Sequence, residues 1–323
     1  MFIKFPYDKL LNQGGLFMEF KKYMHIERLG REEVEGILNG ACYIFPKIDG
    51  TNSVVFIGED GKIHAGSRRQ ELNHEKGLDN QGFMANIIND KSIAQYLFDH
   101  PCHYIYGEWL VKHSIGYYNA DAWRKFYIFD VFDASTGCYL NYDVYKNELE
   151  RYGIKNIIPL MARLENPSQD DITALLQKNH YLINEDEPRF GEGVVIKNYN
   201  FVNKYGRTTF AKVVASEFLK NKQLHREKNH MVKLAGALEE KIVQEFLSEE
   251  VIEKEYQKLI NEGVNYTENR NKFIGILFNR IWHEFLSEEI TAFDKKFHHP
   301  TINFAQLRKA MEFKVKETKP NLF

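Results

Sequence analysis

The pattern of apolar residues changes near Ser216 and divides the chain into two kinds of sequence. Before Ser216, short runs rich in β-branched and aromatic residues predict strands, with a few helical segments between them. The strands do not alternate regularly with helices, which favours an α+β fold built on antiparallel sheets. Residues 231–315 contain one proline and repeat apolar residues at helical spacing. This region is therefore predicted to be helical, and we expect two domains.

The expected elements are short. Strands are predicted at 41–45, 53–57, 62–65, 103–111, 125–132, 192–197 and 209–214, helices at 81–98, 143–152 and 170–178, and one or two helical turns at 31–38. In the helical region, the run Glu-Phe-Leu-Ser-Glu-Glu occurs at 245–250 and again at 284–289. Serine followed by two acids is typical of a helix N-terminus. We expect each copy to be a junction between helices, and a six-residue match in Glu-rich sequence does not establish a duplication.

Composition excludes few functions. The 43 basic and 45 acidic residues nearly cancel, so any binding of nucleic acid would depend on a local basic patch. The three cysteines are widely spaced and form no Cys-x-x-Cys pair, which favours reduced thiols and a cytoplasmic location. No apolar run approaches the roughly 20 residues of a membrane span, and Lys4 and Asp8 interrupt the N-terminal apolar stretches, so neither a membrane segment nor a signal peptide is expected.

A lysine lies between two of the predicted strands, in the run Phe45-Pro46-Lys47-Ile48-Asp49-Gly50-Thr51-Asn52. A lysine at such a bend is held against a sheet, and Gly50 permits a close backbone approach or an unusual φ angle. The alternative is an ordinary Asp-Gly hairpin turn, in which the lysine has no chemical role. The rest of the sequence decides how the run is interpreted.

Lys-x-Asp-Gly resembles the nucleotidyl-lysine motif of the superfamily that contains DNA ligases, RNA ligases and mRNA capping enzymes. Further matches follow in that superfamily's order: Tyr106-Gly107-Glu108-Trp109, Phe126-Tyr127-Ile128-Phe129-Asp130, Glu192-Gly193-Val194-Val195-Ile196-Lys197 and Ala211-Lys212-Val213-Val214. Five short matches in order are much more specific than one. Asn52 stands where DNA ligases and capping enzymes usually have arginine, and Gly50-Thr51-Asn52 looks like the RNA ligase 2-like branch. The run from Phe20 to Glu27 is similar to the opening of that branch, so the resemblance covers roughly residues 18 to 220.

The resemblance implies a nucleotidyltransferase (adenylylation) domain over residues 18–224, with 1–17 as an N-terminal extension and 225–323 as a helical C-terminal domain. It implies an ATP-dependent RNA ligase that works through lysyl-AMP with Mg²⁺ or Mn²⁺. The substrate would be RNA with 5′-phosphate and 3′-OH ends, as a nicked duplex or broken ends, or an RNA/DNA hybrid, and the enzyme would be a monomer. The alternatives are a DNA ligase or capping-type guanylyltransferase, and a catalytically silent nucleic-acid-binding relative.

The matched positions also imply roles for individual residues. Lys47 would be the nucleophile, with Lys212 and Glu192 as the other catalytic residues. The nucleotide would be bound by Lys47, Ile48, Asn52, Arg68, Glu108, Phe129, Glu192 and Lys212, and the metal by Glu192 and Glu108. Arg69 competes with Arg68 for its role. The alternatives are structural: a glutamate at a strand end paired with a surface lysine, and an aromatic ring that belongs to the core.

Strand alternation orients several of these side chains. It places Tyr127 and Phe129 on one face with Asp130 opposite, and it turns Lys197 away from Glu192. Lys197 is therefore not among the predicted site residues.

Two positions depart from the superfamily pattern. Pro46 replaces a frequent glutamate just before the nucleophile, and Val214 replaces the second lysine of a Lys-x-Lys pair. A contact to phosphate is then missing, or it comes from another cation, for which the candidates are Lys204, Arg207 and Lys222. No zinc site is predicted, because His225, His298 and His299 are isolated from cysteines and paired carboxylates at zinc spacing.

Overall fold

A computed structural model describes residues 18–73, 78–111, 115–215, 238–262, 264 and 270–323. The chain divides into two compact units. Among the described residues, the first unit comprises 18–111 and 117–215, and the second comprises 115–116 and the helices from residue 238 onward. The predicted boundary at residue 224 and the predicted extension 1–17 lie outside the described residues and stay predictions.

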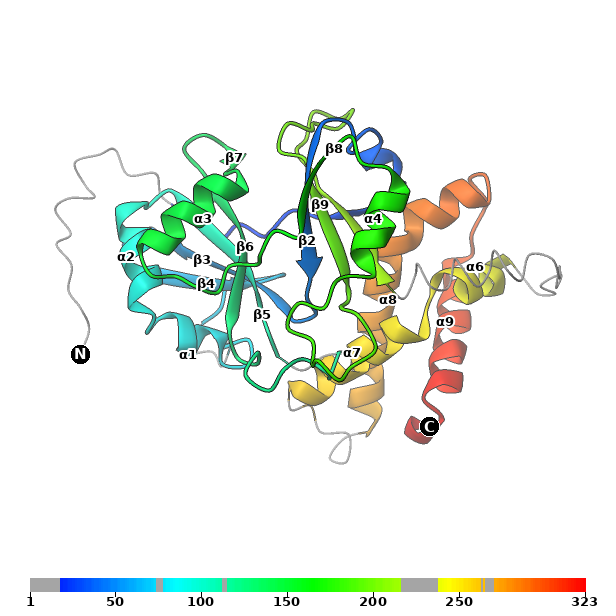
Figure 1. The fold of residues 1–323 in the computed structure, drawn as a ribbon. Helices are drawn as coiled ribbons and strands as arrows, with labels where there is room; N and C mark the ends of the chain where they lie inside the picture. The colour runs from blue at the N-terminus through cyan, green and yellow to red at the C-terminus, as the bar shows by residue number, and fades with distance from the viewer. Residues whose placement is uncertain (1–17, 74–77, 112–114, 216–237, 263, 265–269) are drawn as a thin grey trace. The chain divides into compact units, whose positions relative to one another are not determined.

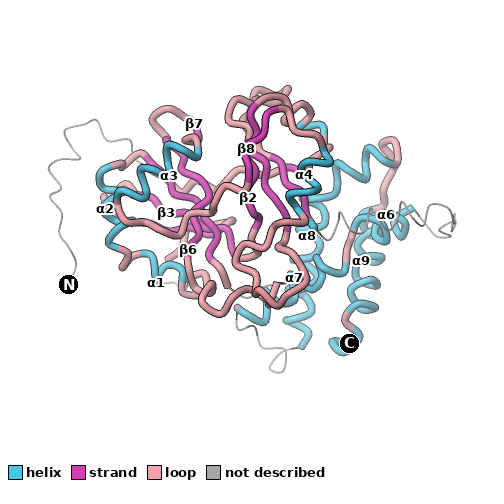
Figure 2. Tube along the Cα trace, in the orientation of Figure 1, coloured by secondary structure: helices cyan, strands magenta, loops and turns pink. Residues whose placement is uncertain are grey.

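The first unit is built on two five-stranded sheets, which Figures 1 and 2 show as separate groups of strands. One sheet has the order β1-β10-β9-β2-β8, and the other has the order β4-β3-β5-β6-β7. The first contains β1 (Glu27–Arg28), β2 (Ala41–Lys47), β8 (Ala162–Glu165), β9 (Gly193–Lys197) and β10 (Ala211–Val214). The second contains β3 (Thr51–Ile57), β4 (Ile63–Ser67), β5 (His103–Trp109), β6 (Phe126–Asp133) and β7 (Cys138–Tyr139). All the strand pairs are antiparallel except β1 with β10.

Four helices in the described part of this unit complete it: α1 (Phe83–Ile87), α2 (Lys91–Asp99), α3 (Tyr142–Arg151) and α4 (Gln169–Leu176). Helices α2 and α3 lie against the second sheet, as Figure 1 shows. The single helix expected at 81–98 is in fact α1 and α2. The break occurs because the Asp90 side chain accepts hydrogen bonds from the backbone of Ser92 and Ile93 and starts a new helix.

The α+β fold with antiparallel sheets and C-terminal helices is confirmed. Each of the seven predicted strands coincides with an observed strand to within a few residues. Strands β1, β7 and β8 were not expected, since two-residue and four-residue strands carry little periodic signal. Residues 31–38 contain only a short 3-10 helix, Glu32–Val34.

The second unit is helical in its described part, with α6 (Leu238–Phe246), α7 (Glu249–Asn261), α8 (Arg270–Lys296), α9 (Phe304–Thr318) and a 3-10 turn at Pro320–Leu322. Its core is formed by apolar side chains from these helices, among them Ile242, Ile252, Phe273, Phe285 and Met311. No helix within the described residues is both long and apolar enough to cross a membrane.

The two copies of Glu-Phe-Leu-Ser-Glu-Glu have different structures. In the first copy, Ser248 caps α7 and accepts a hydrogen bond from the backbone of Val251, so the predicted junction is confirmed. The second copy lies inside α8, where the prediction is wrong. There the Ser287 hydroxyl donates to the Glu284 carbonyl within the helix, and Phe285 is buried in the core of the unit. Tertiary packing therefore overrides the local capping signal.

Candidate active site

Lys47 is the last residue of β2, and its side chain contacts the carboxylate of Glu192, which directly precedes the neighbouring strand β9. The Lys47 Nζ atom donates to Glu192 Oε2 over 2.6 Å. In the sheet, Lys47 is paired with Gly193, so Glu192 stands one residue before the start of β9 and reaches back to the amine. The side chains of Lys47 and Glu192 are 23% and 15% exposed, so this ion pair is partly buried but stays accessible to solvent.

The loop after Lys47 is tied to a second carboxylate. The Gly50 backbone N–H donates to Glu108 Oε1 over 3.1 Å. A Cβ atom at Gly50 would lie 2.5 Å from the Trp109 carbonyl oxygen, closer than real Cβ contacts come, so this close approach needs glycine. Asn52 is paired with Glu108 across β3 and β5, which places both side chains on one face of the second sheet. The structure thus brings Asn52 and Glu108 to the loop that follows the lysine.

The same loop is buried against Tyr118, which the sequence did not indicate. The backbone N–H of Asp49 donates to the Tyr118 hydroxyl over 2.8 Å. Ile48 and Asp49 are 4% and 2% exposed. Their burial fixes the backbone between β2 and β3, and therefore the point at which the Lys47 side chain emerges.

Lys212 lies on the same face of the first sheet as Lys47. Phe45 is paired with Val195, and Val195 is paired with Lys212, so these three side chains share a face. Lys47 follows Phe45 by two residues and points to that face as well. The register also pairs Val214 with Gly193, the residue paired with Lys47. The missing second lysine would thus have stood two strands, or about 10 Å, from Lys47.

Of the cations considered as replacements for that lysine, Lys204 forms an ion pair with Glu32. Arg207 is exposed, and Lys222 lies outside the described residues. Arg68 and Arg69 directly follow β4 and are both exposed, so exposure does not distinguish these two rivals. A role for either arginine in binding nucleotide stays a prediction.

Phe129 lies at an irregularity in β6. The pairing of β5 with β6 passes from Tyr106–Asp130 to Gly107–Ile128, so Phe129 has no partner on β5. Such a β-bulge re-aims a side chain and interrupts alternation. The Phe129 ring lies 4.9 Å from the Tyr23 ring between centroids, and Tyr23 also donates a hydrogen bond to Asp130. The alternation expected here is therefore wrong: Phe129 and Asp130 are both directed toward Tyr23.

A buried ion pair lies behind Phe129. Lys197 Nζ donates to Asp130 Oδ1 over 2.7 Å and to the Phe129 carbonyl oxygen over 2.6 Å, and the two charged side chains are 2% and 0% exposed. The Lys197 ammonium group also lies 4.7 Å from the centre of the Phe45 ring. Burial lowers the pKa of Lys197 and raises that of Asp130, while their mutual attraction opposes both shifts.

Lys197, Asp130 and Tyr23 were not among the predicted site residues. Lys197 and Asp130 each end one of the matched runs, so the signal was present, but their pairing joins positions on different sheets. The segment with Tyr23 is anchored to β5, because the Tyr104 and Tyr106 hydroxyls donate to the backbone carbonyls of Glu19 and Lys21.

The Lys47–Glu192 ion pair of the first sheet and the Asn52–Glu108 pair of the second sheet lie on either side of the loop 48–50. The RNA ligase family model matches residues 41–214, more than half of the chain, and every strand that carries the residues described above. The chain belongs to the RNA ligase family.

No curated protein matches the chain. Solved structures that resemble it include an apo variant of RNA ligase R4a from Naegleria gruberi, with 18% identity and a TM-score of 0.48 over 62% of this chain and 57% of that one. Another Naegleria gruberi RNA ligase variant, with ATP and Mn, has 16% identity and a TM-score of 0.45 over 64% and 59% of the two chains. The chain thus covers less than two thirds of either structure's length.

Proposed function

We propose that the protein is an ATP-dependent RNA ligase that joins 5′-phosphate and 3′-OH ends through a lysyl-AMP intermediate on Lys47. The observation that carries the proposal is the 2.6 Å contact between Lys47 Nζ and Glu192 Oε2. It joins two residues 145 positions apart, each within a run that matches a nucleotidyltransferase motif. A lysine that only caps a hairpin turn is not expected to contact a glutamate that belongs to a second matched motif far along the chain.

In the first step, the Lys47 nitrogen forms a bond to the α-phosphorus of ATP, the bond from that phosphorus to the bridging oxygen breaks, and pyrophosphate leaves. The amine must lose a proton before or during the attack. Glu192 Oε2 is within the distance at which a general base accepts a proton from its partner. Arginine in place of Lys47 would not serve, because a guanidinium stays protonated.

In the second step, the phosphate at an RNA 5′ end attacks the same phosphorus and the bond to Lys47 breaks, which leaves AMP on the 5′ end. In the third step, a 3′-OH attacks the phosphate of that end, a phosphodiester bond forms and AMP leaves. Each attack requires the two reacting groups to be held in line, so positioning carries much of the rate.

The carboxylates of Glu192 and Glu108 fit a hard divalent cation such as Mg²⁺ or Mn²⁺, which binds oxygen ligands and keeps several waters. When bound, the cation would supply positive charge to the phosphate oxygens. Lys212 shares the face of Lys47 and would add a further positive charge, while Phe129 and Val195 would offer apolar surface to the adenine.

The test combines radiolabelled ATP with two kinds of protein variant. Wild-type protein with ATP and Mg²⁺ should form a labelled band, and Lys47→Ala should form none, yet it should still seal a strand whose 5′ end already carries AMP. Lys62→Ala, which removes a lysine whose side chain is 76% exposed, is the matched control and should label like the wild type. Normal labelling of Lys47→Ala would exclude the proposed nucleophile, and labelling by GTP instead of ATP would favour a capping-type enzyme.

A further inference from the structure

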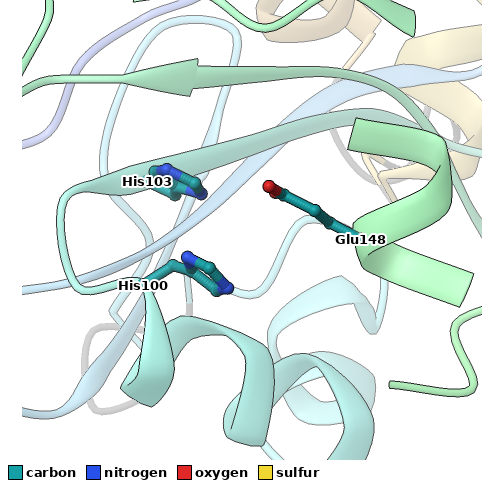
Figure 3. Close-up of side chains that lie close together, drawn as sticks. All are labelled: His100, His103 and Glu148. Atoms are coloured by element: carbon teal, nitrogen blue, oxygen red, sulfur yellow. The ribbon is translucent and has the colours of Figure 1, made fainter. Parts of the chain in front are cut away.

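Two histidines and a glutamate gather in the first unit, on elements other than those that hold Lys47 and Glu192. His100 is the C-cap residue that follows α2, His103 is the first residue of β5, and Glu148 lies on α3. Each offers a ligand atom, and these atoms all lie within 4.8 Å of one another. Figure 3 shows the carboxylate of Glu148 directed toward the two imidazole rings.

The surroundings of this histidine cluster (His100, His103 and Glu148) leave donor atoms available. The Tyr96 hydroxyl lies 2.8 Å from His103 Nδ1 and donates to Glu148 Oε2 over 3.3 Å. The Tyr96 hydroxyl therefore occupies one nitrogen of His103 and one oxygen of Glu148, and the other donor atoms of these two residues are not bound by it. Within the described residues, the His100 side chain makes ring contacts but no hydrogen bond or ion pair. The His100 and His103 rings stack, with centroids 4.9 Å apart.

We propose that the histidine cluster is a binding site for a divalent transition metal of the zinc class, with water completing the coordination. Two imidazoles and one carboxylate form a donor set that zinc accepts, and imidazole distinguishes this site from one suited to Mg²⁺. Ligand atoms around a tetrahedral zinc ion lie about 3.3 Å apart. The distances between the ligand atoms, which are at most 4.8 Å, must therefore shorten by about 1.5 Å at most, through rotation of the side chains. His100, at the end of its helix and without a hydrogen bond, is the residue best placed to rotate.

A metal ion at this position would join three elements that support the catalytic strands. It would tie the α2–β5 turn to α3, and β5 carries Glu108 five residues after His103. On α3, Tyr145 lies one turn before Glu148 and donates its hydroxyl to the Phe129 carbonyl over 2.7 Å. The metal would therefore restrict movement of the strands that carry Glu108 and Phe129. Its binding should raise the melting temperature of the protein.

The test uses the full chain, stripped of metal with a chelator that is then removed. Co²⁺ serves as the coloured probe for a zinc site, and excess Mg²⁺ is present throughout to occupy sites built from oxygen ligands. We expect one Co²⁺ ion to bind with the absorption of a nitrogen- and oxygen-ligated site, to be displaced by Zn²⁺, and to raise the melting temperature.

Two variants of partly exposed residues, His100→Gln and Glu148→Gln, should each weaken Co²⁺ binding by about tenfold or more and remove the rise in melting temperature. His64→Ala is the matched control. The two nitrogens of His64 contact Asp60 and Glu71 on opposite sides of its ring, so they do not converge on one point, and the variant should bind Co²⁺ like the wild type. Circular dichroism shows whether each variant is folded. Failure of the folded wild type to bind Co²⁺, or equal binding by all three variants, would overturn the proposal and leave a cluster held by Tyr96 alone.

Discussion

Lys47 and Lys197 lie on neighbouring strands of one sheet, and each forms an ion pair with a carboxylate far along the chain. The Lys197–Asp130 pair is almost wholly buried, and Lys197 also donates to a backbone carbonyl. The Lys47–Glu192 pair is partly exposed. An ammonium group that is buried and donates to two partners is suited to holding strands together. An ammonium group that is partly exposed to solvent, and that contacts one carboxylate among the described residues, is suited to chemistry.

The largest expected effect concerns the accessible pair. Glu192→Ala removes the group that holds the Lys47 amine and that we propose as its proton acceptor. Formation of the lysyl-AMP adduct should slow by about 10²- to 10⁴-fold, the usual contribution of a general base. The measurement is a time course of labelling with radioactive ATP. Glu192→Asp keeps the charge but shortens the reach, and it should fall between the wild type and Glu192→Ala. Wild-type rates in Glu192→Ala would remove the distinction between the two pairs.

The next prediction concerns the buried pair. Lys197→Met leaves the Asp130 carboxylate buried without its cation, and breaking such a pair costs about 3–5 kcal/mol of unfolding free energy. Chemical denaturation measures this loss. Lys47→Met is the control and should cost about 1 kcal/mol or less, because its partner can still reach solvent. Equal losses in the two variants would show that burial does not separate the roles of these lysines.

The third prediction concerns the loop that follows Lys47, the proposed nucleophile, and it changes neither ion pair directly. In Gly50→Ala the new methyl group would lie 2.5 Å from the Trp109 carbonyl oxygen, so the loop after Lys47 must shift. Misplacement of a reacting group by about 1 Å can reduce the rate about 10²-fold, and we expect a loss of adenylylation of that order. Rapid-quench labelling gives the rate, and Gly275→Ala, within α8 of the second unit where a Cβ atom meets nothing within 4 Å, is the control for the loss of a glycine outside the loop. An unchanged rate in Gly50→Ala would mean that the loop does not position Lys47.

The smallest expected effect is on stability, and it concerns His64, whose ring contacts the carboxylates of Asp60 and Glu71. Burial acts to lower the pKa of His64, but hydrogen bonds and charges from Glu71 and Asp60 outweigh it, so the pKa is raised above its ordinary value of 6.5. A raised pKa in the folded state stabilises the fold below the unfolded value, and this stabilisation is lost as the pH rises through the folded value. The wild type should therefore exceed His64→Ala in stability most clearly below pH 6.5, by about 1 kcal/mol or less. Denaturation at several pH values tests this, and a difference that grows with pH would contradict it.

The residues at the matched motifs could be assigned from the sequence because each lies in a short run that resembles a motif of the superfamily. The resemblance placed Lys47 and Glu192 in one pocket without knowledge of the order of strands in the sheet. The bulge at Phe129 was not predictable, since it depends on the register between β5 and β6. Alternation along β9 predicted that Lys197 points away from Glu192. It could not predict the ion pair of Lys197 with Asp130, because Asp130 lies on the other sheet and no local pattern shows which residues of the two sheets meet.

The histidine cluster was not predicted from the sequence for a similar reason. His100 and His103 stand three positions apart in the run Asp99-His100-Pro101-Cys102-His103, and Glu148 is 45 positions further along the chain, so no local motif joins the three residues. Glu148 joins them only because α3 lies against the second sheet. Distant residues that meet through packing of helices on a sheet are the part of this protein that required the structure.

The most direct test of the central claim is to locate the adduct. Full-length protein is incubated with ATP and Mg²⁺, digested, and its peptides are analysed by mass spectrometry. We predict one AMP group per chain, attached to Lys47, and none on Lys197. An AMP group on Lys197 or on any residue other than Lys47, or no adduct on a folded protein, would contradict it.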